Sequence, residues 1–438
     1  MRPEHVTRRP SYGKNSPAVG ERGARTRQRI LDEALQLFEE KGYYETLSDD
    51  IAGRVGIVRA TLYQYFDGKE AIFRELLEQC AKTLTRLVRR LGPLGPTEQG
   101  FDNLHWWLGE WSWLYDRYAT VFAQWTQVAQ TGELSGDVRR LVDDQGNQIA
   151  ERLAGSAVSG LDPSSAAHML TMLVNRVYFY RVGGLLEPLS EEEVIDALAI
   201  TVQLLLFPET PSSVISNVSL PLVTQTRSDD ALPGTAVVQA RFTDLGARAQ
   251  ATVTRLIDSA CTAFSEHGYH LATVDDVVTT AGVARGTFYK YFTDKIDLLS
   301  AVLERGYTEL SPILETLDHN DPVPEQVRRL LHDFLPWHRR YAGALRIGLT
   351  RLSTDEPVPA FARMLTVRVT GVFEQMLAGV QRDYPFSPRV GAIIMFAVVG
   401  RALDGRPRSA KRRSEPTEDT LDFVGAVIER GLLNRRPS

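Results

Sequence analysis

The sequence predicts an all-α protein built from two copies of one helical unit. Apolar residues recur at the three- and four-residue spacing of a helix face, for example at Ile30, Ala34, Leu37 and Phe38. No segment alternates apolar and polar residues over a strand's length before a hairpin turn. Shifting the chain by 226 residues aligns 14 identical residues over 36 positions without a gap, where chance at roughly 6% per position gives about two. We therefore expect roughly nine helices in each copy and no sheet.

The composition of the 438 residues is that of an ordinary globular chain. Apolar residues make up 43% and charged residues 24%, which excludes a disordered, collagen-like or coiled-coil protein. The net charge of −5 argues against a nucleic-acid coat protein but is compatible with a site-specific DNA reader that has a local basic face. Two cysteines are too few for a disulfide framework or a zinc site, and the longest apolar run is too short for a bilayer. We expect a cytoplasmic protein without a membrane segment.

The repeat and the punctuation between its copies divide the chain into six segments. The N-terminus is rich in arginine and lacks apolar periodicity, so we expect it to be disordered. Proline, serine, threonine and glycine mark the linker, with a short strand across 214–223 as the alternative. In order, the segments are a basic tail (1–24), a small helical domain (25–70), a larger helical domain (71–207), a linker (208–246), a second small domain (247–296) and a second larger domain (297–438).

Each small domain contains two short helices joined by a glycine turn, at about 47–66 in the first copy and about 273–292 in the second. Gly56 and Gly282 break the first helix of each pair, and the next helix of the first copy starts near Arg59. This arrangement is the helix-turn-helix, whose second helix enters the major groove of DNA.

The exposed positions of the second helices carry side chains suited to DNA. Arginine forks to guanine or phosphate, glutamine pairs with adenine, and lysine prefers guanine or phosphate. Threonine and tyrosine hydroxyls reach bases or phosphates, and a lysine at the start of the following helix would hold a phosphate together with a backbone amide. The candidate DNA-binding residues are Arg59, Thr61, Tyr63, Gln64, Tyr65 and Lys69 in the first copy, and Arg285, Thr287, Tyr289, Lys290, Tyr291 and Lys295 in the second.

Some of these aromatic and basic residues also have a purely structural interpretation. We expect Phe66 and Phe292 to belong to the core, and one tyrosine of each Tyr-x-Tyr pair is expected to be partly buried. A plain solvated side chain is the alternative for Lys69 and Lys295.

Both segments resemble the N-terminal signature of the TetR family of bacterial transcriptional regulators. The second copy is similar nearly throughout, over Gly268-Tyr-x-x-x-Thr-Val-x-Asp-Val and Ala-Gly-Val-x-Arg-Gly-Thr-Phe-Tyr-x-Tyr-Phe-x-x-Lys295. The first copy is similar less closely, over Gly42-Tyr-Tyr-Glu-Thr and Val-Gly-Ile-Val-Arg-Ala-Thr-Leu-Tyr-Gln-Tyr-Phe-x-x-Lys69, and it departs from the pattern at Ser48 and Ala60. The motif covers about fifty residues in each copy.

The resemblance implies a three-helix DNA-binding domain followed by a helical ligand-binding and dimerisation domain in each copy. Members of the family generally dimerise through their last two helices, which correspond here to about 164–184, 190–207, 386–403 and 417–434. The chain is thus expected to form an intramolecular pseudo-dimer, with a homodimer left open, and to bind a double-stranded DNA operator as a repressor. The alternative is a ligand-binding or protein-interaction module in which one or both copies no longer bind DNA.

Five of the six tryptophans lie between residues 106 and 125. Such a stripe of rings at helical spacing is more often core, yet so many large rings are difficult to pack inward in a thin helical domain. The functional interpretation is a pocket for a small lipophilic effector. Its candidate residues are Trp107, Trp111, Tyr118 and Trp125.

The sequence predicts no enzyme. It contains no phosphate-binding glycine loop and no nucleophile elbow, and its eight histidines form no metal-ligand pattern with cysteines or carboxylates. We expect no catalytic residue, no cofactor and no metal.

Overall fold

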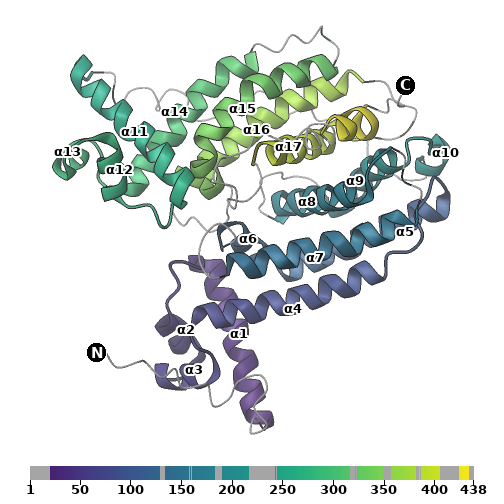
Figure 1. Cartoon of the computed structure of the whole chain (residues 1–438), viewed down its shortest axis with the longest axis horizontal. Coiled ribbons are helices and arrows are strands. Elements are labelled where there is room, and N and C mark those ends of the chain that lie inside the picture. Colours follow the sequence, from purple (N-terminus) through teal and green to yellow (C-terminus); the bar gives the residue numbers. More distant parts are fainter. Residues whose placement is uncertain are drawn as a thin grey trace.

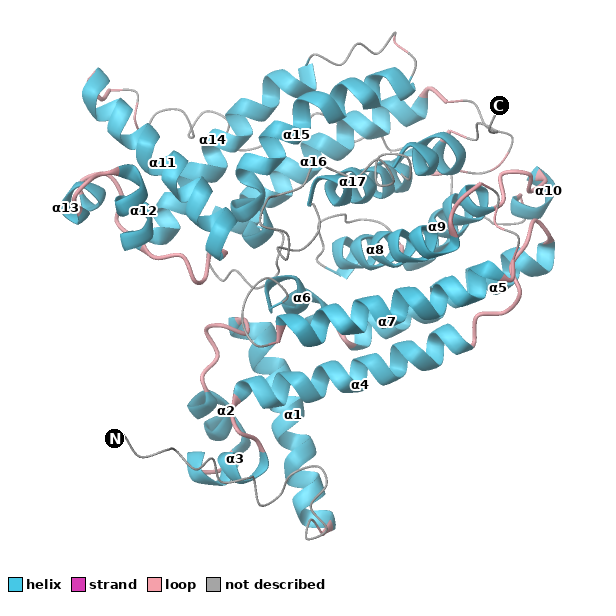
Figure 2. Cartoon of the chain, in the orientation of Figure 1, coloured by secondary structure: helices cyan, strands magenta, loops and turns pink. Residues whose placement is uncertain are grey.

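The computed structural model describes residues 20–128, 134–156, 158, 160–182, 190–216, 242, 244–315, 321, 323–348, 357–380, 384, 386–404 and 424–433. Every regular element in these ranges is helical (Figure 2), which confirms the all-α prediction.

The first copy is a three-helix domain followed by a larger helical domain. Its first helix is amphipathic and buries Ile30, Ala34 and Phe38 on one face, as their spacing predicts. The small domain consists of α1 (Glu21–Lys41), α2 (Ser48–Val55) and α3 (Arg59–Tyr65). The larger domain consists of α4 (Lys69–Arg89), α5 (Glu98–Arg117), α6 (Ala119–Val128), α7 (Ser135–Ala154), α8 (Pro163–Val182) and α9 (Glu191–Leu206), and the short α10 (Ser212–Ile215) follows.

The second copy repeats this order. Leu256, Ala260 and Phe264 line the buried face of its first helix, where the first copy has Ile30, Ala34 and Phe38. The small domain consists of α11 (Ala247–His267), α12 (Val274–Ala281) and α13 (Arg285–Tyr289). The larger domain consists of α14 (Lys295–Glu315), α15 (Val323–Gly348), α16 (Pro357–Ala378), α17 (Pro388–Asp404) and the π-helical segment η1 (Val427–Leu432).

The last helices of the two larger domains pack against one another within the chain. Figure 1 shows α8, α9 and α17 in the middle of the molecule, and α9 and α17 also contact η1. The ring of Tyr180 lies 5.3 Å from that of Phe396, and the Ser387 hydroxyl donates to Glu193 Oε1 at 2.9 Å. These are the helices predicted to form the dimerisation surfaces, so both sets meet inside one polypeptide.

The packing of the larger domains leaves both small domains at the same end of the molecule (left in Figure 1), with the copies stacked on either side of the shared helices. Both candidate DNA-reading elements therefore lie at one end of a single chain.

Two predicted boundaries differ from the structure. Helix α1 begins at Glu21, so the prediction of a disordered tail is wrong for residues 21–24, while residues 1–19 lie outside the described ranges. In the predicted linker, Val214 and Ile215 belong to α10 and not to a strand, and residues 217–241 lie outside the described ranges. The first copy has nine helices before α10; the described part of the second has seven α-helices and η1.

Candidate nucleic-acid interface

A glycine in the left-handed region separates the two short helices of each small domain. Gly56 has φ 73° and Gly282 has φ 64°, a conformation that a β-carbon would strain. The next N–H in each copy, from Ile57 or Val283, donates back into the preceding helix at 3.0 Å and closes the turn. The helix-turn-helix predicted from the repeat is thus present in both copies, and we call α3 and α13 the reading helices.

The reading helices bury one face and expose the other. Phe66 and Phe292 are buried at the ends of these helices, as expected. Tyr65 is buried and Tyr291 half-buried, so the second tyrosine of each pair packs inward and Tyr65 leaves the exposed contact surface. Thr61 and Thr287 are half-buried. The exposed surface carries Arg59, Tyr63 and Gln64 on α3, and Arg285 and Tyr289 on α13 with Lys290 directly after it.

An aspartate on the preceding helix pairs with the first arginine of each reading helix. Arg59 Nη1 lies 3.0 Å from Asp49 Oδ2, and Arg285 Nη1 lies 3.0 Å from both carboxylate oxygens of Asp275. A hydrogen bond to the tyrosine one turn later and the aspartate charge raise the pKa of both guanidiniums, so both stay charged. Exposed pairs of this kind contribute little, so a phosphate or a guanine can displace the aspartate. The pairs orient the two arginines before DNA arrives.

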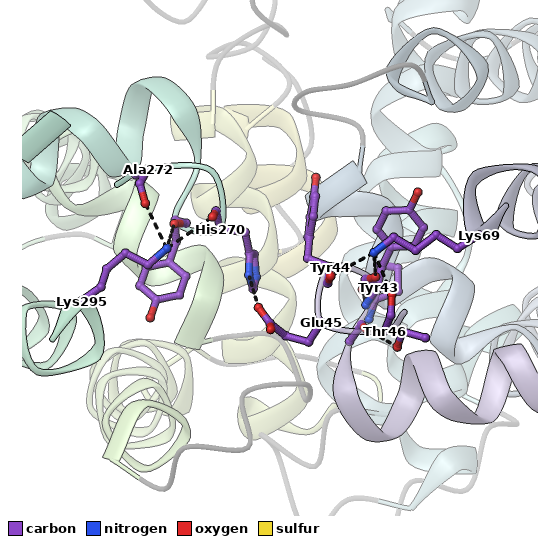
Figure 3. A network of polar contacts seen from close by, with 11 residues as sticks. Tyr43, Tyr44, Glu45, Thr46, Lys69, His270, Ala272 and Lys295 are labelled. Carbon is purple, nitrogen blue, oxygen red and sulfur yellow. Dashed lines mark hydrogen bonds and ion pairs between the residues drawn. The ribbon is translucent and has the colours of Figure 1, made fainter. Parts of the chain in front are cut away.

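Lys69, at the start of α4, is a structural residue of the first small domain. Its Nζ donates to the carbonyl oxygens of Tyr43, Tyr44 and Thr46, each at 2.9 Å, in the loop between α1 and α2 (residues 42–47; Figure 3). The ammonium also lies 4.9 Å from the centre of the Tyr43 ring. An ammonium has three donors, and all three are used.

Lys295 repeats this arrangement in the second copy. Its Nζ donates to the carbonyl oxygens of Tyr269, His270 and Ala272 at 2.9, 3.3 and 3.0 Å, in the loop between α11 and α12 (residues 268–273). Burial lowers the pKa of both lysines. The prediction that these ammonium groups hold phosphates is therefore wrong for this geometry, because their donors are spent on backbone carbonyls. The sequence pattern therefore singled out two lysines with a shared role, but their partners are backbone carbonyl oxygens and not phosphates.

Each larger domain contacts the C-terminal end of the first helix of its small domain. In the first copy the buried Gln124 of α6 accepts from the Tyr43 N–H at 2.9 Å and donates to the Phe38 carbonyl at 3.4 Å. In the second copy a Cβ added at Gly343 of α15 would lie 2.5 Å from the carbonyl carbon of Phe264, the residue equivalent to Phe38. Sequence reasoning missed both residues, because a lone glutamine or glycine within a helix carries no local signal.

The buried phenylalanines that follow the two reading helices, Phe66 and Phe292, contact different side chains in the two copies. Glu75 on α4 pairs with Arg27 on α1, whose guanidinium lies 4.3 Å from the centre of the Phe66 ring. In the second copy Phe242, from the predicted linker, packs against Phe292 with ring centres 5.7 Å apart. The buried phenylalanine after the reading helix is therefore packed against an ion-paired arginine in the first copy and against an aromatic ring in the second.

The predicted effector residues lie in the core of the first larger domain. Trp107 and Trp111 are fully buried with their rings 4.7 Å apart, and the Trp107 N–H donates to the Leu87 carbonyl at 3.2 Å. Tyr118 is also buried and shares a 3.3 Å hydrogen bond with Thr83; the side chain of Trp125 lies outside the described residues. These positions match the core interpretation, and a role in effector binding stays a prediction.

Five residues of this domain carry buried side-chain atoms without a hydrogen-bond partner among the described residues. In Arg181 and Gln203 the atoms are Nε and Oε1, and other atoms of both side chains are bonded. The others are the Trp111 indole N–H, both amide atoms of Gln145 on α7, and Oδ1 of Asn175 on α8. Buried polar atoms without partners cost about 1–3 kcal/mol each and are uncommon in native proteins.

The described residues contain no group of three or more histidine, cysteine, aspartate or glutamate side chains that could hold a metal ion. None of the helices in the described ranges combines the length and apolar character that crossing a membrane needs.

Comparison with known proteins identifies the two small domains. Residues 30–76 and 256–302 match the family described as "Bacterial regulatory proteins, tetR family". The biofilm operon icaADBC HTH-type negative transcriptional regulator IcaR of Staphylococcus aureus is 29% identical over 129 residues, which cover 29% of this chain and 67% of that protein. The Staphylococcus epidermidis IcaR is 46% identical over 54 residues, 12% of this chain and 29% of that protein.

Solved structures similar to part of this chain include two regulators. A TetR/AcrR-family transcriptional regulator from Thermobifida fusca is 24% identical with a TM-score of 0.32, covering 40% of this chain and 96% of its own. The fatty acid degradation regulator FadR from Bacillus halodurans is 22% identical with a TM-score of 0.33, covering 42% of this chain and 97% of its own.

Proposed function

Because the chain is a transcriptional regulator of the tetR family that carries the family's N-terminal domain twice, we propose that one chain binds a DNA operator with both reading helices. The observation that carries this proposal is the pair of equivalent, outward-facing surfaces on α3 and α13 at one end of a single polypeptide. The packing of α8 and α9 against α17 and η1 supports an intramolecular pseudo-dimer. Since IcaR is by name a negative transcriptional regulator, we propose repression as the direction of control.

The operator is proposed to be an imperfect palindrome. In a homodimer both reading helices are identical, and the operator mirrors that symmetry. Here the helices share arginine, threonine and tyrosine at matching positions but differ at Gln64 and Lys290. Glutamine pairs bidentately with adenine, whereas lysine prefers guanine or phosphate. The two half-sites should therefore be related but unequal, with centres about one helical turn apart.

Replacing Arg59 or Arg285 by alanine is expected to relax a different half-site in each case, by about 1–3 kcal/mol of binding free energy, because each arginine reads its own half-site. Selection of bound sequences from random DNA, followed by affinity measurements on the selected site, would give both values.

The matched control is Arg54→Ala. Arg54 is also an exposed arginine in an ion pair, with Glu40 at 2.5 Å, but it lies on α2 and not on a reading helix. It should leave the preference at both half-sites unchanged. A perfectly symmetric selected site that binds two chains would contradict the pseudo-dimer, and no selected site at all would favour a module that has lost DNA binding.

We also propose that a small, mainly lipophilic effector binds in the first larger domain and releases the DNA. The buried rings supply apolar surface, and the unpaired polar atoms of Trp111, Gln145 and Asn175 supply the few polar contacts that a ligand would satisfy. Gln124 links the same domain to the loop before α2, which gives ligand binding a direct contact with the DNA-binding domain. A coupling of about 1–3 kcal/mol would suffice for release.

A further inference from the structure

The two small domains touch each other through equivalent residues. Tyr44 and His270 are separated by 226 residues, the same shift that aligns the copies. Their rings stack with centres 4.9 Å apart and an angle of 19° between the planes. Figure 3 shows the pair between the two lysine networks, and His270 Nδ1 faces Glu45 Oε1 at 4.0 Å. The contact therefore lies where a pseudo-two-fold axis would relate the two copies.

Both stacked residues are held at their backbones. The Lys69 ammonium donates to the Tyr44 carbonyl oxygen at 2.9 Å, and the Lys295 ammonium donates to the His270 carbonyl oxygen at 3.3 Å. The neighbouring Tyr43 and Tyr269 pack against Phe38 and Phe264 in the two small-domain cores, at 5.5 and 5.3 Å between ring centres. Each loop is thus a fixed extension of its own domain. A stack between two fixed loops constrains the domains themselves.

We propose that the Tyr44–His270 stack is a positioning contact that sets the spacing and orientation of the two reading helices before DNA binds. The loops end where α2 and α12 begin, at Ser48 and Val274, so each loop is only one short helix and one turn away from its reading helix. Fixing the loops therefore fixes the helices relative to each other. The distance between the two reading helices, and with it the separation of half-sites that the chain binds best, would then be set before DNA binds.

The contact also favours pairing of a first copy with a second copy over pairing of two like copies. The first loop has Tyr44 and Glu45 where the second has His270 and Leu271. The stacked histidine faces Glu45, and this pairing requires one loop of each kind. Two first copies from different chains would present two tyrosines and two glutamates to each other, and like charges side by side are unfavourable.

The inference rests on the proposed DNA binding, so its test has one part that needs no DNA. Cysteines introduced at Gln64 on α3 and at Lys290 directly after α13 would carry nitroxide labels. Double electron–electron resonance would then give the distribution of distances between the labels. The native Cys80 and Cys261 are buried, and burial raises the pKa of both thiols, so labelling should be confined to the new sites. The unsubstituted contact should give a narrow distribution, and Tyr44→Ala or His270→Ala a broad one.

The second part uses DNA with the two half-sites at a series of separations. An aromatic pair of this kind corresponds to a factor of about two to ten in an equilibrium constant. Tyr44→Ala should lower affinity for the best separation by about that factor, flatten the preference among separations, and leave affinity for a single half-site unchanged. Tyr44→Phe keeps the ring and should behave as the unsubstituted chain.

The proposal would be overturned if both alanine variants kept a narrow distribution of label distances and an unchanged preference among the half-site separations. If the unsubstituted chain binds no DNA, the proposed function fails while the label distances still decide whether the contact positions the helices.

Acidification should weaken the contact. Burial, and then the nearby charge of Lys295, lower the pKa of His270 to about 4, whereas Glu45 acts in the opposite direction. The other groups facing the imidazole are Tyr44 across the contact and Tyr269 in its own loop. Opening the contact removes the burial that the first copy provides, while Lys295 stays beside His270. The pKa of His270 therefore rises from about 4 towards its ordinary value of about 6.5, and protons favour the open state below that pH, by at most about tenfold per pH unit. The label distribution should broaden between pH 7.5 and pH 5, and His270→Phe should remove this dependence. A distribution that does not change with pH would contradict it.

Discussion

Replacing Lys295 by methionine is expected to lower the free energy of unfolding by about 2–4 kcal/mol, because it leaves three backbone carbonyl oxygens without their charged donor. Methionine has a similar length and keeps an apolar chain beside the Tyr269 ring, but it removes the cation–π contact of the ammonium, which lies 4.4 Å from the ring centre. The loss should therefore report the hydrogen bonds together with this contact. Chemical denaturation, with hydrogen exchange in residues 268–273 as a local probe, would measure it.

Lys290→Met is the matched control for this change. Lys290 is exposed at the end of α13 and its ammonium lies 5.6 Å from the Tyr291 ring, without the three carbonyl acceptors of Lys295. Its replacement should alter stability by no more than about 0.5 kcal/mol. If Lys295→Met instead weakened binding to all DNA sequences alike while stability stayed constant, the prediction that Lys295 holds a phosphate would be correct.

The fold could be predicted from the sequence where local physics and repetition agree. The identities between the copies exposed the duplication, and glycines at positions 56 and 282 marked turns that the structure places in the left-handed region. The exposure of Arg59 and Arg285 follows from the short period of a helix with one buried face. These features depend on residues a few positions apart, so a single sequence contains them.

The contacts between distant segments could not be predicted in the same way. Lys69 and Lys295 stand out in the sequence because they recur in both copies, but their carbonyl partners lie 23 to 26 residues earlier and depend on how the loops turn back. The stack between Tyr44 and His270 joins two positions that the repeat aligns, yet the residues differ. Two aligned residues meet only if both copies pack around one axis, and that is a property of the packed helices and not of the repeat itself.

Replacing Trp111 by alanine is expected to cost about 3–5 kcal/mol of stability, the range for removing a fully buried tryptophan. Such a loss measures packing and cannot by itself distinguish core from effector site. Trp111→Phe separates the two, because it keeps a buried ring and removes only some volume and the indole N–H, which has no hydrogen-bond partner. Thermal and chemical denaturation would measure stability, and quenching of tryptophan fluorescence by lipophilic compounds would measure binding.

Trp107→Phe is the control that makes this prediction quantitative. It removes a similar volume from the neighbouring ring, but it also removes the 3.2 Å hydrogen bond to the Leu87 carbonyl. It should therefore be less stable than Trp111→Phe by about 0.5–1.5 kcal/mol, the net contribution of one hydrogen bond. If the unpaired N–H of Trp111 serves an effector, Trp111→Phe should bind a quenching compound more weakly while its stability without ligand stays close to that of the unsubstituted chain. Equal quenching by the same compound in both phenylalanine variants and in the unsubstituted chain would assign both tryptophans to the core alone.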